Sequence, residues 1–303
     1  MGYLFLGVAL LMSKVKGYCG KKISGYTSEL RKLLLISLIR LALCVPFGFA
    51  FAVLLTGRLS EFIVSPTTII ICSLSGFSSA IFVFTWLTCI RKGAYAMIDV
   101  FLTIGVVVPL ILCSVFFKER IGHIRWLGVF LLVLATVIMC WYSKGIKQKQ
   151  TGKSLLVLIL CGLANGLNQF AQKWFTRQGE SNASVFNFYA YIFATLTLLV
   201  LFFAFNFKKK HQKFFPSVTK RTFFYVLVMA VSLFLHSYFS TLSAEKLSSA
   251  ELFPLQQGLG LILSVIMSAI FFKERINLKC VVGISVTLLA LFIINVLPSI
   301  ASR

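Results

Sequence analysis

The pentapeptide FFKER occurs twice in the chain, at Phe116–Arg120 and again 155 positions later at Phe271–Arg275. Each copy follows one long apolar run and precedes another. When the chain is laid on itself at this offset, Gly7 also falls on Gly162. The offset is about half of the 303 residues, which indicates a duplicated architecture. FFKER itself is typical of a charged turn at a helix end, where its charges cap the helix or pair locally.

The amino-acid composition indicates whether this chain folds in water or in a lipid bilayer. Hydrophobic residues make up 59% of the sequence and charged residues only 13%, too few polar groups to cover a water-soluble surface. A helix that crosses a hydrocarbon core of about 30 Å needs roughly 20 mostly apolar residues. The apolar runs are continuous rather than alternating with polar residues, which excludes a membrane β-barrel. The sequence therefore predicts an all-α integral membrane protein.

Charges and Pro/Gly clusters divide the chain into ten predicted transmembrane helices. These are residues 2–20, 33–56, 67–90, 94–117, 124–142, 153–175, 184–206, 222–243, 249–272 and 279–297. The repeat offset divides them into two five-helix repeats, residues 1–148 and 149–303. Because five is odd, the second repeat must enter the membrane in the opposite orientation. Inverted repeats of this kind are typical of secondary transporters that work by alternating access.

The segments FFKERIGHIRWLGVFLLVLATVIM and FFKERINLKCVVGISVTLLALFII resemble the end of each repeat in EamA-like members of the drug/metabolite transporter (DMT) superfamily. The resemblance covers essentially the whole chain. It implies a ten-helix transporter in the cell (plasma) membrane that carries a small solute, such as an amino acid or a nucleobase-like compound. It also implies either proton coupling or solute exchange, and it leaves the substrate open.

The first helix, YLFLGVALLMSKVKG, also resembles the opening of the small multidrug resistance proteins. Those proteins carry a membrane-embedded glutamate at the position of Ser13, whose partner in the second repeat is Asn168. Since this chain has no carboxylate there, the resemblance does not extend to exchange of cationic drugs for protons. Ser13 remains a candidate cavity residue.

The formal net charge of +22 is large, but the basic residues lie in scattered turns between apolar spans. This pattern argues against nucleic acid as a partner. Counted by loop, 21 Lys and Arg lie on one side of the membrane and 8 on the other. The positive-inside rule then predicts both termini outside the cell, whereas family members usually have both termini inside. The orientation stays open.

The richest polar stripe lies in the sixth span. Asn165, Asn168, Gln169 and Gln172 recur at i, i+3, i+4 and i+7, on one helical face. They either line a substrate cavity or form interhelical hydrogen bonds beside the small-residue motif Gly162–Gly166. Both interpretations remain open at this stage.

Two further spans carry polar candidates. Gln256 and Gln257 lie beside Pro254, which either breaks the helix and exposes backbone groups to a substrate or only kinks it. In the eighth span, His236 shares a face with Ser232 and Ser240. It is expected to be a buried histidine bonded to a serine or, alternatively, a proton carrier.

Three aromatic residues are candidates for stacking against a flat or cationic ligand, namely Trp86, Tyr191 and Tyr238. Lys14 and Lys16 stand near the predicted end of the first span. We expect their long side chains to extend along the helix to the membrane interface.

Arg40 and Asp99 are charges inside otherwise apolar spans. We hypothesise that both face a water-filled cavity, where Asp99 binds a proton or a substrate cation. Arg40 would then pair with Asp99 or attract a carboxylate of the substrate. The alternative for Asp99 is an interfacial position at a helix end.

No enzyme motif or metal-ligand spacing occurs, so we expect no catalytic activity, no metal and no cofactor. The expected partners are a small-molecule substrate, the lipid bilayer and, with coupling, protons. Two alternatives remain: a flippase for a lipid-linked substrate, and a non-transporting membrane scaffold or partner subunit. The sequence does not indicate an oligomeric state.

Overall fold

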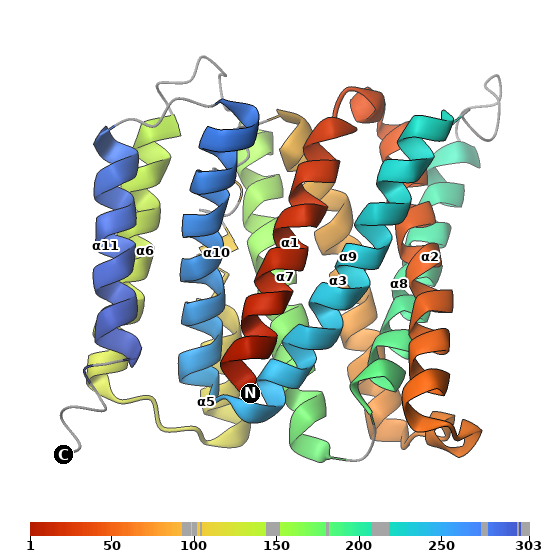
Figure 1. Cartoon of the computed structure of the whole chain (residues 1–303), viewed down its shortest axis with the longest axis horizontal. Helices are drawn as coiled ribbons and strands as arrows, with labels where there is room; N and C mark the ends of the chain where they lie inside the picture. Colours follow the sequence, from red (N-terminus) through yellow and green to blue (C-terminus); the bar gives the residue numbers. More distant parts are fainter. Residues whose placement is uncertain are drawn as a thin grey trace.

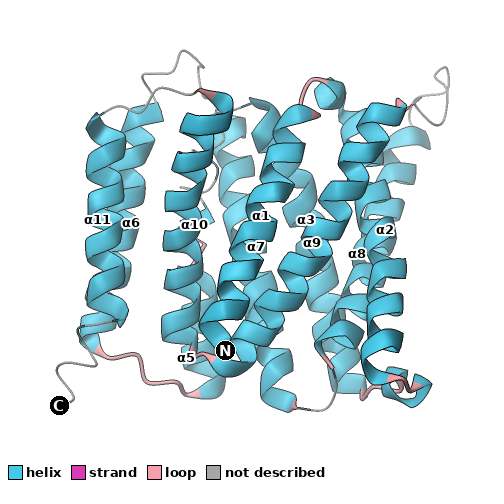
Figure 2. Cartoon of the chain, viewed as in Figure 1, coloured by secondary structure: helices cyan, strands magenta, loops and turns pink. Residues whose placement is uncertain are grey.

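The computed structural model describes residues 1–92, 98, 102–103, 105–143, 152–179, 182–207, 218–273, 278–295 and 297. Helices are the only regular elements in these residues (Figure 2). The α-helices are α1 (Gly2–Lys22), α2 (Leu30–Thr56), α3 (Pro66–Lys92), α5 (Val107–Phe117), α6 (His123–Ser143), α7 (Gly152–Gln178), α8 (Ala183–Phe207), α9 (Lys220–Lys246), α10 (Ser249–Phe272) and α11 (Leu278–Asn295). Two short 3₁₀ helices, η1 (Tyr26–Ser28) and η2 (Leu59–Phe62), connect α1 to α2 and α2 to α3.

The helices confirm the predicted all-α membrane class. Within the described residues, α2, α3, α8, α9 and α10 are each long and apolar enough to cross a membrane by length and composition. Large apolar side chains face outward from the bundle, for example Leu54, Val200, Ile270 and Leu278. An outer surface of this kind suits contact with lipid rather than water.

The helices stand side by side as an elongated bundle (Figure 1). At one edge α6 packs against α11, and at the opposite edge α2 packs against α8. Between these pairs, α1 lies along α9, while α3 contacts both α7 and α8. The centre of the bundle is thus formed by α1, α3, α7 and α9, with α10 beside α1.

The fourth predicted span, 94–117, is not one continuous helix. Gly105 and Val106 form a turn, and α5 begins only at Val107. A Cβ atom on Gly105 would lie 2.2 Å from the backbone oxygen of Gly162, so α7 leaves no room for a side chain there. Pro109 falls in the first turn of α5, where its missing N–H is tolerated. The expected close contact at Gly162–Gly166 is therefore confirmed, and its partner is this turn.

The FFKER pentapeptides end helices, as predicted. α5 ends at Phe117 and α10 at Phe272, and the next residues, Lys118 and Lys273, adopt left-handed φ values of 53° and 52°. A left-handed residue just after the last turn is a common helix stop. One detail of the prediction was wrong: Glu119 pairs with Arg177 of α7 rather than locally.

Candidate functional site

Two adjoining chambers lie among the central helices. The first is small, with a cavity volume of about 40 Å³, and is lined mainly from α1, α3, α7, α9 and α10. The second has a cavity volume of about 20 Å³ and is lined from α3, α7, α8, α9 and α10. Five residues line both: Phe82, Asn165, Gln169, His236 and Gln256. We treat the chambers as one cavity, whose shared wall is mainly polar.

α1 contributes Ser13, Lys14 and Lys16 to the first chamber. The prediction that both lysines reach the interface was wrong. α1 continues to Lys22, which places Lys16 about 9 Å from the helix end at 1.5 Å per residue. Lys14 is 6% exposed and donates to Ser264 Oγ at 2.5 Å, while Lys16 is 3% exposed.

The polar stripe of α7 both lines the cavity and forms interhelical hydrogen bonds, the two interpretations that the sequence left open. All four residues line the second chamber. Asn168 also accepts hydrogen bonds from Ser75 (2.7 Å) and Ser79 (3.1 Å), which join α7 to α3. Gln172 donates to Ser237 (3.1 Å) on α9.

Gln169 differs from its neighbours on the stripe. Its Oε1 is buried and has no hydrogen-bond partner among the described residues. Gln256 resembles it in part, because its Nε2 donates to Ser240 Oγ at 3.3 Å while its Oε1 is buried without a partner in the same described set. Two buried amide groups thus keep hydrogen-bonding capacity at the cavity wall.

α10 is continuous through Pro254, so the hypothesised break in this helix is not present. Gln256 and Gln257 reach the cavity from an intact helix, and Gly260 one turn later also lines the first chamber. Gly258 faces the other way, where a Cβ would lie 2.7 Å from Leu291 of α11. The glycine there serves helix packing.

His236 lines both chambers, but its partner is not the expected serine. Its Nδ1 lies 2.8 Å from the backbone oxygen of Ala9 on α1. Because a carbonyl oxygen can only accept, Nδ1 carries the hydrogen in this contact. In the neutral ring Nε2 is then the acceptor.

The three aromatic candidates have different surroundings. Trp86 lines the first chamber and Tyr191 the second, where the Tyr191 hydroxyl donates to the Leu233 backbone oxygen at 3.3 Å. Tyr238 lines neither chamber. It packs in an aromatic cluster, with ring centroids 5.3 Å from Phe51 and 6.2 Å from Phe234.

Arg40 is fully buried in α2, and its Nε, Nη1 and Nη2 have no hydrogen-bond partner among the described residues. Its guanidinium carbon lies 5.3 Å from the Trp86 ring centroid, and Lys16 Nζ lies 5.4 Å from the same centroid. Arg40 therefore stands next to a residue of the cavity wall. Asp99, its hypothesised partner, lies outside the described residues.

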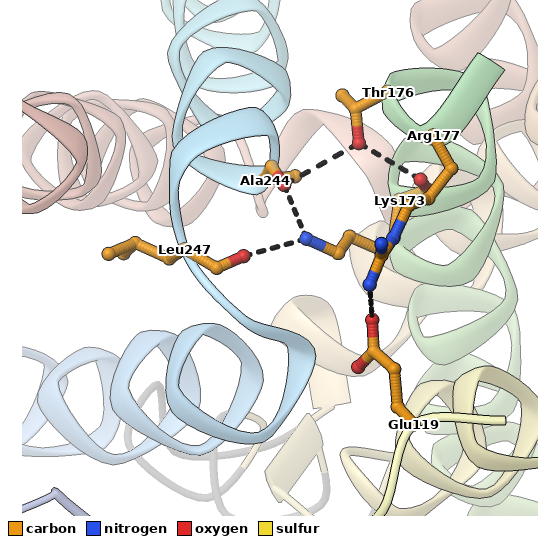
Figure 3. A network of polar contacts seen from close by, with 6 residues as sticks. All are labelled: Glu119, Lys173, Thr176, Arg177, Ala244 and Leu247. Atoms are coloured by element: carbon orange, nitrogen blue, oxygen red, sulfur yellow. Dashed lines mark hydrogen bonds and ion pairs between the residues drawn. The ribbon is translucent and has the colours of Figure 1, made fainter. Parts of the chain in front are cut away.

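Polar contacts close the bundle at the end where α1 and α10 begin, which we call the N-terminal end (Figure 3). Lys173 of α7 donates to the backbone oxygens of Ala244 (2.7 Å) and Leu247 (2.6 Å) at the end of α9. Arg177 pairs with Glu119, and Arg125 pairs with Glu251 at 3.1 Å. The buried Lys173 also suits the negative end of the α9 dipole.

Sequence reasoning missed Lys14, Lys16 and Lys173 as interior residues. Their distance from the helix end could have indicated this. α1 continues to Lys22 and α7 to Gln178, so each of these lysines lies several residues inside its helix. α1 and α7 are also absent from the helices that are apolar enough to count as membrane spans.

Comparison with known proteins agrees with this class of fold. Residues 152–296 match the EamA-like transporter family. A solved crystal structure, described only as that of a protein, has a TM-score of 0.73 to this chain at 14% identity. The similarity covers 100% of this chain and 99% of the other, and it concerns the fold alone. No curated protein matches the chain.

The helical bundle indicates a multi-pass membrane protein, and the family match over residues 152–296 suggests a transporter of small solutes. The second half of the chain, residues 152–296, is similar to the EamA-like transporter family, which supports a place in the DMT superfamily. The resemblance noted in the sequence is thereby confirmed for residues 152–296.

Proposed function

We propose that this chain is a secondary transporter that carries a small organic solute across the cell membrane by alternating access. In this proposal residues 1–148 and 149–303 are inverted halves that rock about the central cavity. The observation that carries the proposal is the cavity itself, whose wall includes the buried amide oxygens of Gln169 and Gln256, unpartnered among the described residues. A bound polar solute would supply the missing hydrogen bonds.

The packing of the helices supports the inverted halves. Exchanging the halves would pair α1 with α7, α3 with α9, and α5 with α10. Under this exchange the contact of α1 with α9 corresponds to that of α7 with α3, and both contacts occur. The contacts of α5 with α7 and of α10 with α1 correspond in the same way.

The polar contacts at the N-terminal end support a gate. Glu119 and Arg125 belong to the proposed first half, and their partners Arg177 and Glu251 belong to the second. Ion pairs between the halves would hold this end closed while the opposite end admits the solute. Opening would require both pairs to separate.

Solute flux into proteoliposomes tests the proposal. The purified protein is first screened against pooled metabolites for those that raise its melting temperature, since a ligand of the folded state stabilises it. We expect labelled forms of these ligands to enter proteoliposomes with saturation and to exchange for unlabelled ligand inside. Gln169→Ala should reduce this flux, and its matched control is Leu163→Ala, because Leu163 faces outward on α7 at 44% exposure. Binding without flux in the unmodified protein would contradict transport and favour a non-transporting role.

A further inference from the structure

We infer that the solute binds as a hydrogen-bond donor: N–H or O–H groups of the solute donate to the amide oxygens of Gln169 and Gln256. This inference rests on the proposed transport function and names the substrate class of the same cavity. A directed chain of hydrogen bonds, which runs from α8 to the cavity wall, sets the orientation of the Gln256 amide.

The chain of hydrogen bonds begins at a backbone carbonyl on α8. Asn187 donates from Nδ2 to the backbone oxygen of Ala183 at 2.7 Å. Because a carbonyl oxygen can only accept, this bond fixes Asn187 Oδ1 as the atom that faces Ser237. Ser237 Oγ lies 2.5 Å from Asn187 Oδ1 and therefore donates its single hydrogen there. The atom of Gln172 that lies 3.1 Å from Ser237 Oγ must then be a donor, its Nε2.

The hydrogen bonds keep the same direction from α7 to α10. Since Gln172 Nε2 donates to Ser237, Gln172 Oε1 faces Ser240, whose Oγ donates to it at 3.3 Å. Ser240 has only one hydrogen, so the Gln256 atom that lies 3.3 Å from its oxygen must donate and is Nε2. Gln256 Oε1 is consequently turned away from Ser240, and it is buried without a hydrogen-bond partner among the described residues. An amide held in this orientation offers an acceptor at the cavity wall.

Two other acceptors lie at the same part of the wall. Gln169, Gln256 and His236 each line both chambers. Gln169 Oε1 is also buried without a partner in the described part of the chain. His236 Nδ1 donates to the Ala9 backbone oxygen, so its Nε2 is an acceptor in the neutral ring. A buried acceptor without a partner is costly, and a donor group of the solute would remove that cost.

The test compares isomers that have the same composition and differ in their donors. The compound 5,6-dimethyluracil has N–H groups at both ring nitrogens, whereas 1,3-dimethyluracil carries methyl groups there. Hexane-1,2,6-triol has hydroxyl groups, whereas 1,2,3-trimethoxypropane has only ether oxygens. We expect at least one donor isomer to raise the melting temperature of the purified full chain, with no increase from its methylated isomer. The first pair tests N–H donors and the second pair tests O–H donors.

Variants locate the group that binds the donor. Gln256→Met should weaken the apparent affinity for the donor isomer about tenfold, since the acceptor is lost and the length of the side chain is kept. The matched control is Leu255→Met, because Leu255 is the neighbouring residue on α10 and lines neither chamber. This variant should bind like the unmodified protein.

Asn187 tests the direction of the hydrogen-bond chain, because it positions Gln256 and lines neither chamber itself. Without Asn187, Ser237 can donate to Gln172 instead. The Gln256 amide is then no longer held in one orientation. We expect Asn187→Leu to lower the preference for the donor isomer over its methylated isomer about fivefold. Asn295→Leu is the control, because Asn295 also donates to a backbone oxygen one turn earlier on its helix, at 2.9 Å, and lines neither chamber.

Four results would overturn the inference. Methylated isomers that stabilise the protein as much as the donor isomers would show that no donor is needed. No effect of either donor isomer would assign these acceptors to water. An equal loss of affinity in Gln256→Met and Leu255→Met would indicate general damage to α10, and an unchanged preference in Asn187→Leu would contradict the positioning of Gln256.

Failure of the transport proposal has a different signature. In that case the donor isomer binds with the expected dependence on Gln256, yet its labelled form does not cross proteoliposome membranes.

Discussion

Asn168 and Gln169 are neighbours on α7, yet their surroundings differ. Asn168 accepts hydrogen bonds from Ser75 and Ser79, whereas Gln169 Oε1 has no partner among the described residues. Gln169→Ala should therefore lower transport about tenfold while leaving the melting temperature near its normal value, if a solute bond worth about 1.4 kcal/mol is lost. Flux and thermal unfolding of the purified variant measure the two effects.

Asn168→Ala is the matched comparison. It removes two interhelical hydrogen bonds, worth about 0.6 kcal/mol each in membrane proteins, so its main effect should be on stability. If instead Gln169→Ala melts at a lower temperature and transports normally, Gln169 is a packing residue and not part of the binding wall.

Arg40 supplies a second prediction at the residue scale. The Arg40 guanidinium is buried without a hydrogen-bond partner among the described residues, so an apolar side chain of similar size would avoid its cost of desolvation. We expect Arg40→Met to raise the melting temperature of the ligand-free protein. Arg125→Met, which breaks the ion pair with Glu251, is the comparison and should not stabilise. A lower melting temperature for Arg40→Met would reveal a native anionic partner, for which Asp99 is the first candidate.

At the scale of elements, the Gly105 turn packs closely against α7, a helix that lines both chambers. A Cβ on Gly105 would meet the Gly162 oxygen at 2.2 Å, so Gly105→Ala forces the backbones apart. We expect a loss of about 1–3 kcal/mol in unfolding free energy, the usual cost of overpacking. Gly7→Ala is the control, since a Cβ there would meet no atom of another helix within 4 Å and alanine favours the helix. Equal melting temperatures for the two variants would contradict the close contact.

The sequence predicted most helices within a few residues, because continuous apolar runs between charged turns specify a spanning helix directly. α8, for example, was expected at 184–206 and occupies Ala183–Phe207. The interruption before α5 could not be predicted in this way, because it depends on the close approach of Gly162 from a distant helix. Local sequence shows only the glycine and the proline that permit the turn.

The candidate site was predicted in part. Hydrophobic periodicity grouped the α7 stripe correctly, and the structure brings most of the candidate polar residues to one cavity. The sequence could not say which face of α9 meets the cavity, and so it placed Tyr238 with the candidates although that residue packs against Phe51. The lysines of α1 were missed because a lysine near a helix end usually reaches the interface.

At the scale of the whole molecule, the ion pairs at the N-terminal end predict a shift between open and closed states. A partly exposed pair contributes up to about 1 kcal/mol, so Arg177→Gln should raise the population open at this end by up to about fivefold. Maleimide labelling of a cysteine at Ser249, in a chain without other cysteines, measures this opening because Ser249 is fully buried in the closed state. Lys32→Gln, which breaks a pair within the first turn of α2, is the control and should leave the labelling rate unchanged.

The most direct test of alternating access is the accessibility of the cavity wall from the two sides of the membrane. Ser13→Cys places one thiol in the first chamber of a chain whose eight native cysteines are replaced. Membrane-impermeant maleimide is added from one side at a time, in right-side-out and inverted vesicles. Alternating access predicts labelling from both sides, and a bound solute should slow it from each. Labelling from one side alone, under every condition that supports flux, would contradict the account.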